Sequence, residues 1–222
     1  MPWPTPLIQL LATSEDQVDN VYRPLQAMAR GPYLSNLMRV GEQFIRLPNE
    51  GRIDVVTSSA QSRLGNPITF ALQDETQLYT QTNKLVKVAE TMRRGLAGMG
   101  GRSMETTNCW DPAEQSVAQR TYEAKAADVF KFYETPPADL KWSVRADRKK
   151  ILEFNYSGSP HVPVTQVLAE AEELAETDPG QAERFYGNRI VAGHGVWCAP
   201  ERWNARAKPR EVPEGTQVVG GF

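Results

Sequence analysis

The chain has 222 residues, of which 40% are hydrophobic and 23% are charged, and its formal net charge is −2. These values are typical of a globular domain and exclude a disordered polyelectrolyte or a wholly basic nucleic-acid-binding surface. The separation of Cys109 from Cys198, and of His161 from His194, argues against a zinc site or a disulfide framework, and no membrane span or signal peptide is evident, so we expect a cytoplasmic protein.

A strand that leads directly into a helix is expected at the start of the chain. Residues 7–12 form a short apolar run, and Ser14 followed three positions later by Gln17 is typical of a capped helix start. Pro24 should kink this helix, and Gly31 with Pro32 should end it.

A short helix and a β-hairpin should follow. The helix is expected over residues 33–40. Apolar, β-branched runs at residues 44–47 and 53–56 flank the strong turn sequence Pro48-Asn49-Glu50-Gly51, so these two runs are predicted to pair. Residues 57–66 are rich in Ser, Gly and Arg and should form a loop or a short helix.

Residues 67–75 are an apolar run of strand length that ends in two adjacent acids, Asp74 and Glu75. A buried strand offers no favourable place for a carboxylate, so acids at its tip normally face a cleft where a metal ion or water offsets their desolvation. The alternative is a strand that simply exits into solvent. The pattern is similar to the Walker B motif of P-loop nucleotide hydrolases, whose first acid holds Mg²⁺ and whose second activates the attacking water.

The next elements should place a second polar strand tip beside these acids. A helix is predicted over residues 85–92, with Asn83 as a possible cap and the glycines of residues 98–101 as its end. A short strand follows over residues 103–107. Its tip carries three polar residues, Thr106, Thr107 and Asn108. Strand, helix and strand make a βαβ unit with parallel strands, so both tips should lie at the sheet edge where open α/β sheets bind ligands.

The rest of the chain predicts fewer regular elements. Asp111-Pro112-Ala113-Glu114 is typical of a helix start, and this helix should reach residue 126 before a strand at residues 129–133. Helices are predicted over residues 164–176 and 181–191, whereas residues 140–156 show no clear period. We therefore expect an α/β fold with a mainly parallel sheet, followed by a small C-terminal subdomain.

Several segments, taken in this order, resemble the large subunit of bacteriophage terminases, the ATP-driven motors that package viral DNA. The resemblance covers nearly the whole chain. The Walker B tip, the coupling motif and a sequence similar to the family's Phe-Tyr-Asn signature occur in the family's order. The matching residues are 58–60, 63–66, 70–75, 93–98, 105–108 and 183–189.

The resemblance implies how the chain is divided. Residues 1–135 would be an incomplete RecA-like ATPase core, and residues 136–222 a lid and linker that lead to the family's nuclease domain. The Walker A sequence Gly-x-x-x-x-Gly-Lys-Thr/Ser does not occur here, since in residues 95–103 Gly101 stands where the lysine belongs and the segment follows the Walker B strand. The first strand, the P-loop and its helix would lie before Met1, and the nuclease domain after Phe222.

The resemblance also implies a role for each site residue. Asp74 would hold Mg²⁺, Glu75 would be the general base, and both would contribute to ATP binding. The coupling residues, Thr106, Thr107 and Asn108, would sense the γ-phosphate and relay hydrolysis to DNA movement, unless they are an ordinary polar strand end. Three arginines are candidates for a finger that acts in trans, although a solvated helix end explains the first two as well: Arg93, Arg94 and Arg102.

The function expected from the resemblance is that of the ATPase part of a DNA-packaging motor, which works with ATP and Mg²⁺. The implied partners are double-stranded viral DNA, the portal protein, the small terminase subunit and further copies of the chain in a homo-oligomeric ring, all in the host cytoplasm and without a membrane. Without a P-loop to position the phosphates, this chain alone should hydrolyse negligible ATP.

Other functions are open at this point. The chain could be a non-catalytic terminase remnant or an assembly module that binds DNA or motor subunits, and a helicase is a third interpretation. A basic run beside Trp142 is more simply a solvated face than a DNA contact; its residues are Lys141, Arg145, Arg148, Lys149 and Lys150. Trp110, Trp197 and Trp203 should be packing residues, and both histidines should be loop residues.

Overall fold

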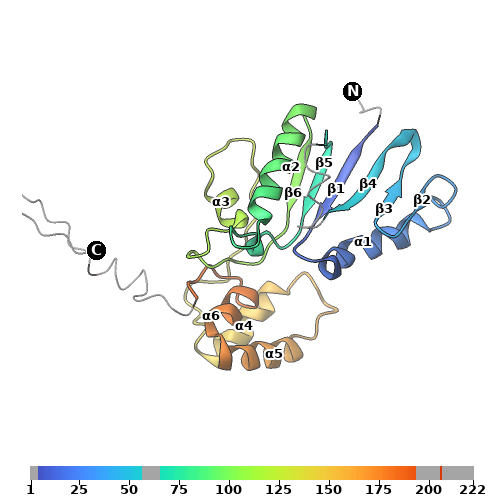
Figure 1. The fold of residues 1–222 in the computed structure, drawn as a ribbon. Helices are drawn as coiled ribbons and strands as arrows, with labels where there is room; N and C mark the ends of the chain where they lie inside the picture. Colours follow the sequence, from blue (N-terminus) through green and yellow to red (C-terminus); the bar gives the residue numbers. More distant parts are fainter. Residues whose placement is uncertain (1–4, 57–65, 194–205, 207–222) are drawn as a thin grey trace, which may run out of the picture.

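The computed structural model describes residues 5–56, 66–193 and Arg206 (Figure 1). In these residues six strands form one mixed sheet in the order β2-β3-β4-β1-β5-β6. A group of three helices lies beyond the edge of the sheet at which the parallel strands end (Figure 1). The structure confirms the predicted α/β class and the mainly parallel sheet.

The parallel part of the sheet positions the two polar strand tips. It consists of β4 (Arg52–Val56), β1 (Leu7–Leu11), β5 (Phe70–Gln73) and β6 (Arg102–Glu105). Leu11 pairs with Val56 on one side and with Gln73 on the other, and Gln73 pairs with Glu105. Because all four strands end in this register, the residues that follow them meet along one edge.

The helix α1 (Glu15–Ala29) packs on one face of the sheet, where Val18 and Tyr22 are buried. The predicted cap forms, since the Oγ of Ser14 accepts a hydrogen bond from the backbone N–H of Gln17 at 3.2 Å. Pro24 lies inside the helix, which continues to Ala29. The helix thus ends two residues before Gly31, the residue at which its end was predicted.

The predicted hairpin forms from β3 (Phe44–Arg46) and β4, which pair antiparallel across the 3-10 turn η1 (Pro48–Glu50). The prediction of a helix over residues 33–40 is wrong. Turns there lead into β2 (Arg39–Val40), which pairs with β3. Pairing lets Met38 and Val40 join the apolar cluster beneath α1, which a single exposed helical turn would not achieve.

The helix α2 (Leu85–Met99) covers the opposite face of the sheet and completes the predicted βαβ unit with β5 and β6. Lys84 is its N-cap residue, while the Oδ1 of Asn83 accepts the N–H of Leu85 at 3.2 Å. Gly100 ends the helix in the left-handed region, with φ 61°, as the glycine-rich signal predicted.

Two predictions for the following stretch are wrong. Asp111 does not start a helix, because α3 (Val117–Glu123) begins later, with Ser116 as its cap. Residues 129–133 form no strand. The Nζ of Lys131 donates to the backbone oxygens of Tyr122 at 2.5 Å and Ala124 at 2.6 Å, which ties this segment to the end of α3 instead of to the sheet.

The helical group consists of α4 (Arg145–Asn155), α5 (Val164–Thr177) and α6 (Pro179–Phe185). The predicted helix at residues 164–176 is confirmed as α5. The helix α4 had no clear period because only Ile151 and Leu152 of its residues are buried. The helix predicted over residues 181–191 is shorter, since α6 begins after the cap residue Asp178 and ends at Phe185.

Polar contacts join the helical group to the stretch that follows β6. The hydroxyl of Tyr133 donates to the backbone oxygen of Asn188 at 2.9 Å, and the Nδ2 of Asn188 donates to the oxygen of Glu134 at 2.8 Å. The Oδ2 of Asp111 accepts the N–H of Gly193 at 2.7 Å. Within the described part of the chain, no helix is long and apolar enough to span a bilayer.

Candidate functional site

Two polar strand tips meet at the carboxyl edge of the sheet. The ladder continues past both strands, since the N–H of Asp74 donates to the oxygen of Leu11 at 2.9 Å and the N–H of Thr106 donates to the oxygen of Gln73 at 3.0 Å. The Oγ1 of Thr106 then donates to the Oδ1 of Asp74 at 2.5 Å. The structure therefore brings together the two tips that the βαβ pattern placed at one edge.

The surroundings of Asp74 suit a cation that arrives with a ligand. The N–H of Glu75 also donates to Oδ1, at 3.1 Å, so among the described residues both hydrogen bonds fall on one oxygen and none on Oδ2. The described residues contain no group of three or more His, Cys, Asp or Glu that could hold a metal. Mg²⁺ commonly takes one or two carboxylates and completes its shell with water and phosphate, which fits Asp74 with Thr106 beside it.

Glu75 occupies an unusual backbone conformation for a residue with a side chain. Its φ of 55° and ψ of 47° lie in the left-handed region, which costs a non-glycine residue about 1 kcal/mol. The Nε2 of Gln17 donates to its Oε2. Burial raises the pKa of Glu75, the charge of Asp74 raises it further, and the Gln17 hydrogen bond lowers it. A carboxylate of raised pKa is a better proton acceptor.

The other two coupling residues hydrogen-bond to a turn, and no hydrogen bond among the described residues joins their side chains to the acids. The turn is η3 (Thr76–Leu78), in which Gln77 is buried. The N–H of Gln77 donates to the Oγ1 of Thr107 at 3.1 Å, and the N–H of Asn108 donates to the Oε1 of Gln77 at 3.2 Å. Gln77 thus ties the coupling tip to the turn after Glu75, a role that no local sequence signal indicated.

The candidate finger arginines differ in their contacts. The Nη2 of Arg93 donates to the Oε1 of Glu105 at 2.7 Å and also to the Oγ1 of Thr121, so it joins α2 to β6 and α3. Among the described residues, the Nη2 of Arg94 donates along its own helix, to the Oγ1 of Thr91 at 3.1 Å. Arg102 is exposed at the start of β6. Arg93 would have to leave its ion pair to act on a neighbouring subunit.

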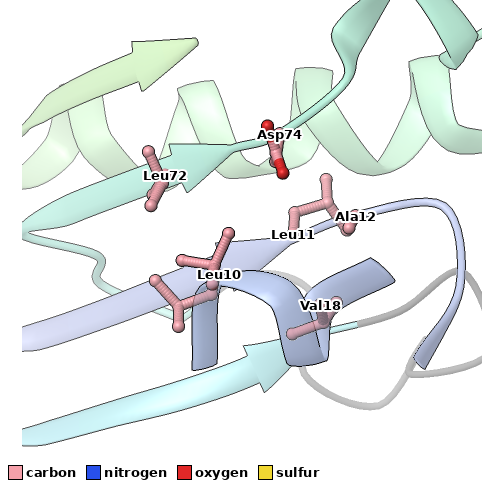
Figure 2. A pocket seen from close by; sticks show the side chains of 7 residues that line it. Leu10, Leu11, Ala12, Val18, Leu72 and Asp74 are labelled. Carbon is pink, nitrogen blue, oxygen red and sulfur yellow. The ribbon is translucent and has the colours of Figure 1, made fainter. Parts of the chain in front are cut away.

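A small apolar hollow adjoins Asp74 between β1, β5 and α1. Figure 2 shows the carboxylate at the tip of β5, with apolar side chains of the two strands and of α1 around the gap. The lining residues are Leu10, Leu11, Ala12, Val18, Val21, Leu72 and Asp74. The gap has no room for a water molecule, so it is a packing defect beside the acid and a nucleotide would have to bind outside it.

A second hollow of about 290 Å³ lies among the helices of the helical group. Its lining includes Trp142, Arg148 and Glu183. None of the residues predicted for ATP binding, coupling or the finger belongs to it.

Three residues of the basic run, Arg145, Arg148 and Lys149, pair with acids of the helical group. Arg145 pairs with Glu172 at 2.6 Å, and Lys149 lies 3.7 Å from Glu153. The guanidinium of Arg148 lies 5.2 Å from the centre of the Trp142 ring. These contacts favour the interpretation as a solvated face over a DNA contact.

The remaining predicted residues divide into described and undescribed positions. Trp110 is buried, as a packing residue should be, and His161 lies in the turn before α5. The following predicted residues lie outside the described part of the chain: residues 58–60 and 63–65, His194, Trp197, Cys198, Trp203 and the C-terminal residues 217–222.

The fold is similar to that of solved phage large terminases, whose ATPase domains have a RecA-like fold. The crystal structure of the HK97 bacteriophage large terminase matches 84% of this chain and 40% of its own, with a TM-score of 0.57 and 16% identity. The Thermus phage P74-26 large terminase ATPase domain matches 85% of this chain and 78% of its own, with a TM-score of 0.50 and 12% identity. The expected terminase-like fold is confirmed.

Two curated proteins are similar in sequence. The Gene 13 protein of Mycobacterium phage D29 is 24% identical over 233 residues, which cover 91% of this chain and 39% of that protein. The Gene 13 protein of Mycobacterium phage L5 is 24% identical over 228 residues, covering 89% and 38%. The chain thus spans about two fifths of the length of these relatives. No model of a known protein family matches it.

Proposed function

We propose that this chain is the ATPase part of a phage terminase large subunit, in which ATP hydrolysis drives the packaging of viral DNA. The observation that carries the proposal is the hydrogen bond between Asp74 and Thr106, because it joins the acid-bearing tip to the coupling tip. The fold shared with large terminases supports it.

Each site residue has a role in this proposal. Asp74 would hold Mg²⁺ through Oδ2, with the hydroxyl of Thr106 fixing its other oxygen. Glu75 would accept the proton of the attacking water. Bound ATP would supply the transferable phosphoryl group, and bound Mg²⁺ would neutralise its charge. Thr107 and Asn108, which contact Gln77, would transmit a change at Asp74 to the turn η3.

The partners belong to the same proposal. Viral double-stranded DNA, the portal protein, the small terminase subunit and further copies of the chain in a ring would act with it in the host cytoplasm. Arg94 is better placed than Arg93 for a role in trans, because it makes no ion pair with another element of the described chain.

The proposal is tested by supplying, in trans, a polypeptide that carries a P-loop. The chain alone should hydrolyse negligible ATP, because positioning of the phosphates provides most of the catalysis of phosphoryl transfer. The mixture should turn over, and Glu75→Gln should abolish that turnover. The matched control is Glu114→Gln, which neutralises an exposed acid outside the site. If the chain alone hydrolyses ATP, and Glu75→Gln abolishes this hydrolysis, the expected inactivity is contradicted.

A non-catalytic assembly module is the second candidate. The absence of a Gly-x-x-x-x-Gly-Lys sequence from these 222 residues favours it. In the same experiment, binding of the P-loop polypeptide without any turnover would support the module and exclude the split motor.

A further inference from the structure

The first turn of α1 contributes a side chain to the proposed site that is not among the predicted residues. Gln17 completes half of a capping box, since its N–H donates to the Oγ of Ser14. In a reciprocal capping box its side chain would turn back to the N–H of Ser14. Its Nε2 instead donates to the Oε2 of Glu75, which lies 58 residues later in the chain.

The strand register makes this contact possible. β1 and β5 are parallel neighbours, with Leu11 opposite Gln73, and the N–H of Asp74 continues the ladder to the oxygen of Leu11. The chain enters α1 directly after β1 and reaches Glu75 directly after β5. The first turn of the helix and the second acid therefore leave the sheet side by side.

Glu75 depends on a partner for its orientation. Among the described residues, the hydrogen bond from Gln17 is the one that reaches the carboxylate of Glu75. The backbone there lies in the left-handed region, outside the extended conformation of β5. A donor on a separate element therefore sets where the carboxylate points.

Gln17 retains one unused hydrogen-bonding group. Its Oε1 is buried and has no hydrogen-bond partner among the described residues. A buried acceptor without a partner costs about 1–3 kcal/mol, so a donor at this point would be favoured.

We propose that Gln17 is a positioning residue that holds the carboxylate of Glu75 in place and links α1 to the acid pair. This inference rests on the proposed role of Glu75 as the general base. Gln17 acts through Glu75, so removing its amide misdirects the base and leaves the two strand tips in place.

The contact is tested on the isolated chain by NMR of the side-chain amides. In Glu75→Ala and in the shorter Glu75→Asp, the Nε2 protons of Gln17 should shift upfield relative to wild type, because they lose a carboxylate acceptor. Gln17→Leu assigns the signal by its disappearance. Gln26 is the internal control, since its Nε2 on the same helix donates to the oxygen of Gly41 at 2.9 Å and should not move. A Gln17 signal unchanged in both Glu75 variants overturns the inference.

The functional consequence is measured in the mixture with the P-loop polypeptide. Gln17→Leu should lower kcat on the order of tenfold and leave KM for ATP unchanged, whereas Gln26→Leu should change neither. Equal kcat for Gln17→Leu and wild type overturns the positioning role. If the mixture shows no turnover at all while the NMR signal of Gln17 still responds to Glu75→Ala, the proposed ATPase is overturned and the contact is not. The failure of the proposed function can thus be told apart from the failure of this inference.

Discussion

Thr106 donates a hydrogen bond of 2.5 Å to Asp74, and this bond joins the residues that follow two neighbouring parallel strands. Both side chains are half-buried, so the carboxylate is partly shielded from water. A hydrogen bond to a charged group contributes about 1.5–3 kcal/mol to stability. The contact therefore stabilises the edge of the sheet whether or not a nucleotide binds.

Replacing the hydroxyl of Thr106 should weaken the fold. Thr106→Val keeps the shape of the side chain and should lower the free energy of unfolding by about 1–2 kcal/mol, because the Oδ1 of Asp74 loses a donor. Thr106→Ser retains the hydroxyl and should recover most of the loss. Urea denaturation of the three proteins measures both changes. Equal stability of the Val and Ser variants would show that the hydrogen bond contributes nothing.

The backbone conformation of Glu75 predicts that glycine is more stabilising than alanine at this position, which is the reverse of their order within a helix. At φ 55° glycine is unstrained, so Glu75→Gly should be more stable than Glu75→Ala by about 1 kcal/mol. The matched control is Glu90, which is exposed and lies within α2. There the alanine variant should have a free energy of unfolding about 1 kcal/mol higher than the glycine variant. Thermal or urea unfolding of the four variants gives both differences. The same order at both positions would refute the left-handed conformation of Glu75.

Arg93 should contribute to stability more than its neighbour. Arg93→Met removes the contact with Glu105, whose side chain is 14% exposed, and should cost about 1 kcal/mol. Arg94→Met should cost less than about 0.5 kcal/mol, since the hydrogen bond of the exposed Arg94 within the described residues stays on its own helix. A double-mutant cycle of Arg93→Met with Glu105→Gln isolates the pair. A coupling free energy of zero would show that Arg93 is free to act elsewhere.

Glu183 should make stability depend on pH. Burial raises the pKa of its carboxyl, although Arg189 at 3.6 Å opposes the shift. A raised pKa in the folded state contributes stability at pH values below the unfolded pKa, and this contribution is lost as the pH rises through the folded value. The free energy of unfolding of Glu183→Gln, relative to that of wild type, should therefore increase from about pH 4 to about pH 8. Urea unfolding at both pH values checks this, and a difference that does not change with pH would contradict it.

The acid pair and its neighbouring tip could be predicted because their signals are local. The apolar run before Asp74 predicts the strand, and the parallel strands of a βαβ unit then place Thr106 at the same edge of the sheet. The left-handed conformation of Glu75 and the contacts of Gln77 have no such signal, because they depend on the register of β5 with β6.

At two positions a side chain that the sequence placed at a helix start also makes a distant contact. The Oδ1 of Asp111 accepts the local N–H of Ala113 at 2.9 Å, while its Oδ2 accepts the N–H of Gly193 and lies 3.7 Å from Arg184. The N–H of Gln17 makes the predicted cap with Ser14, while its side chain binds Glu75. In both cases the local pattern identified a hydrogen-bonding residue but not its distant partner.

The position of β6 at the end of the strand order has a dynamic consequence. β6 pairs with β5, and no other described strand borders it, so its outer amides should exchange hydrogen with solvent sooner than those of the central strands. Because Thr106 continues β6, local opening of this edge would release Asp74 while β4, β1 and β5 stay paired. Among the described strands, we therefore expect the coupling tip to open at a free-energy cost below that of global unfolding.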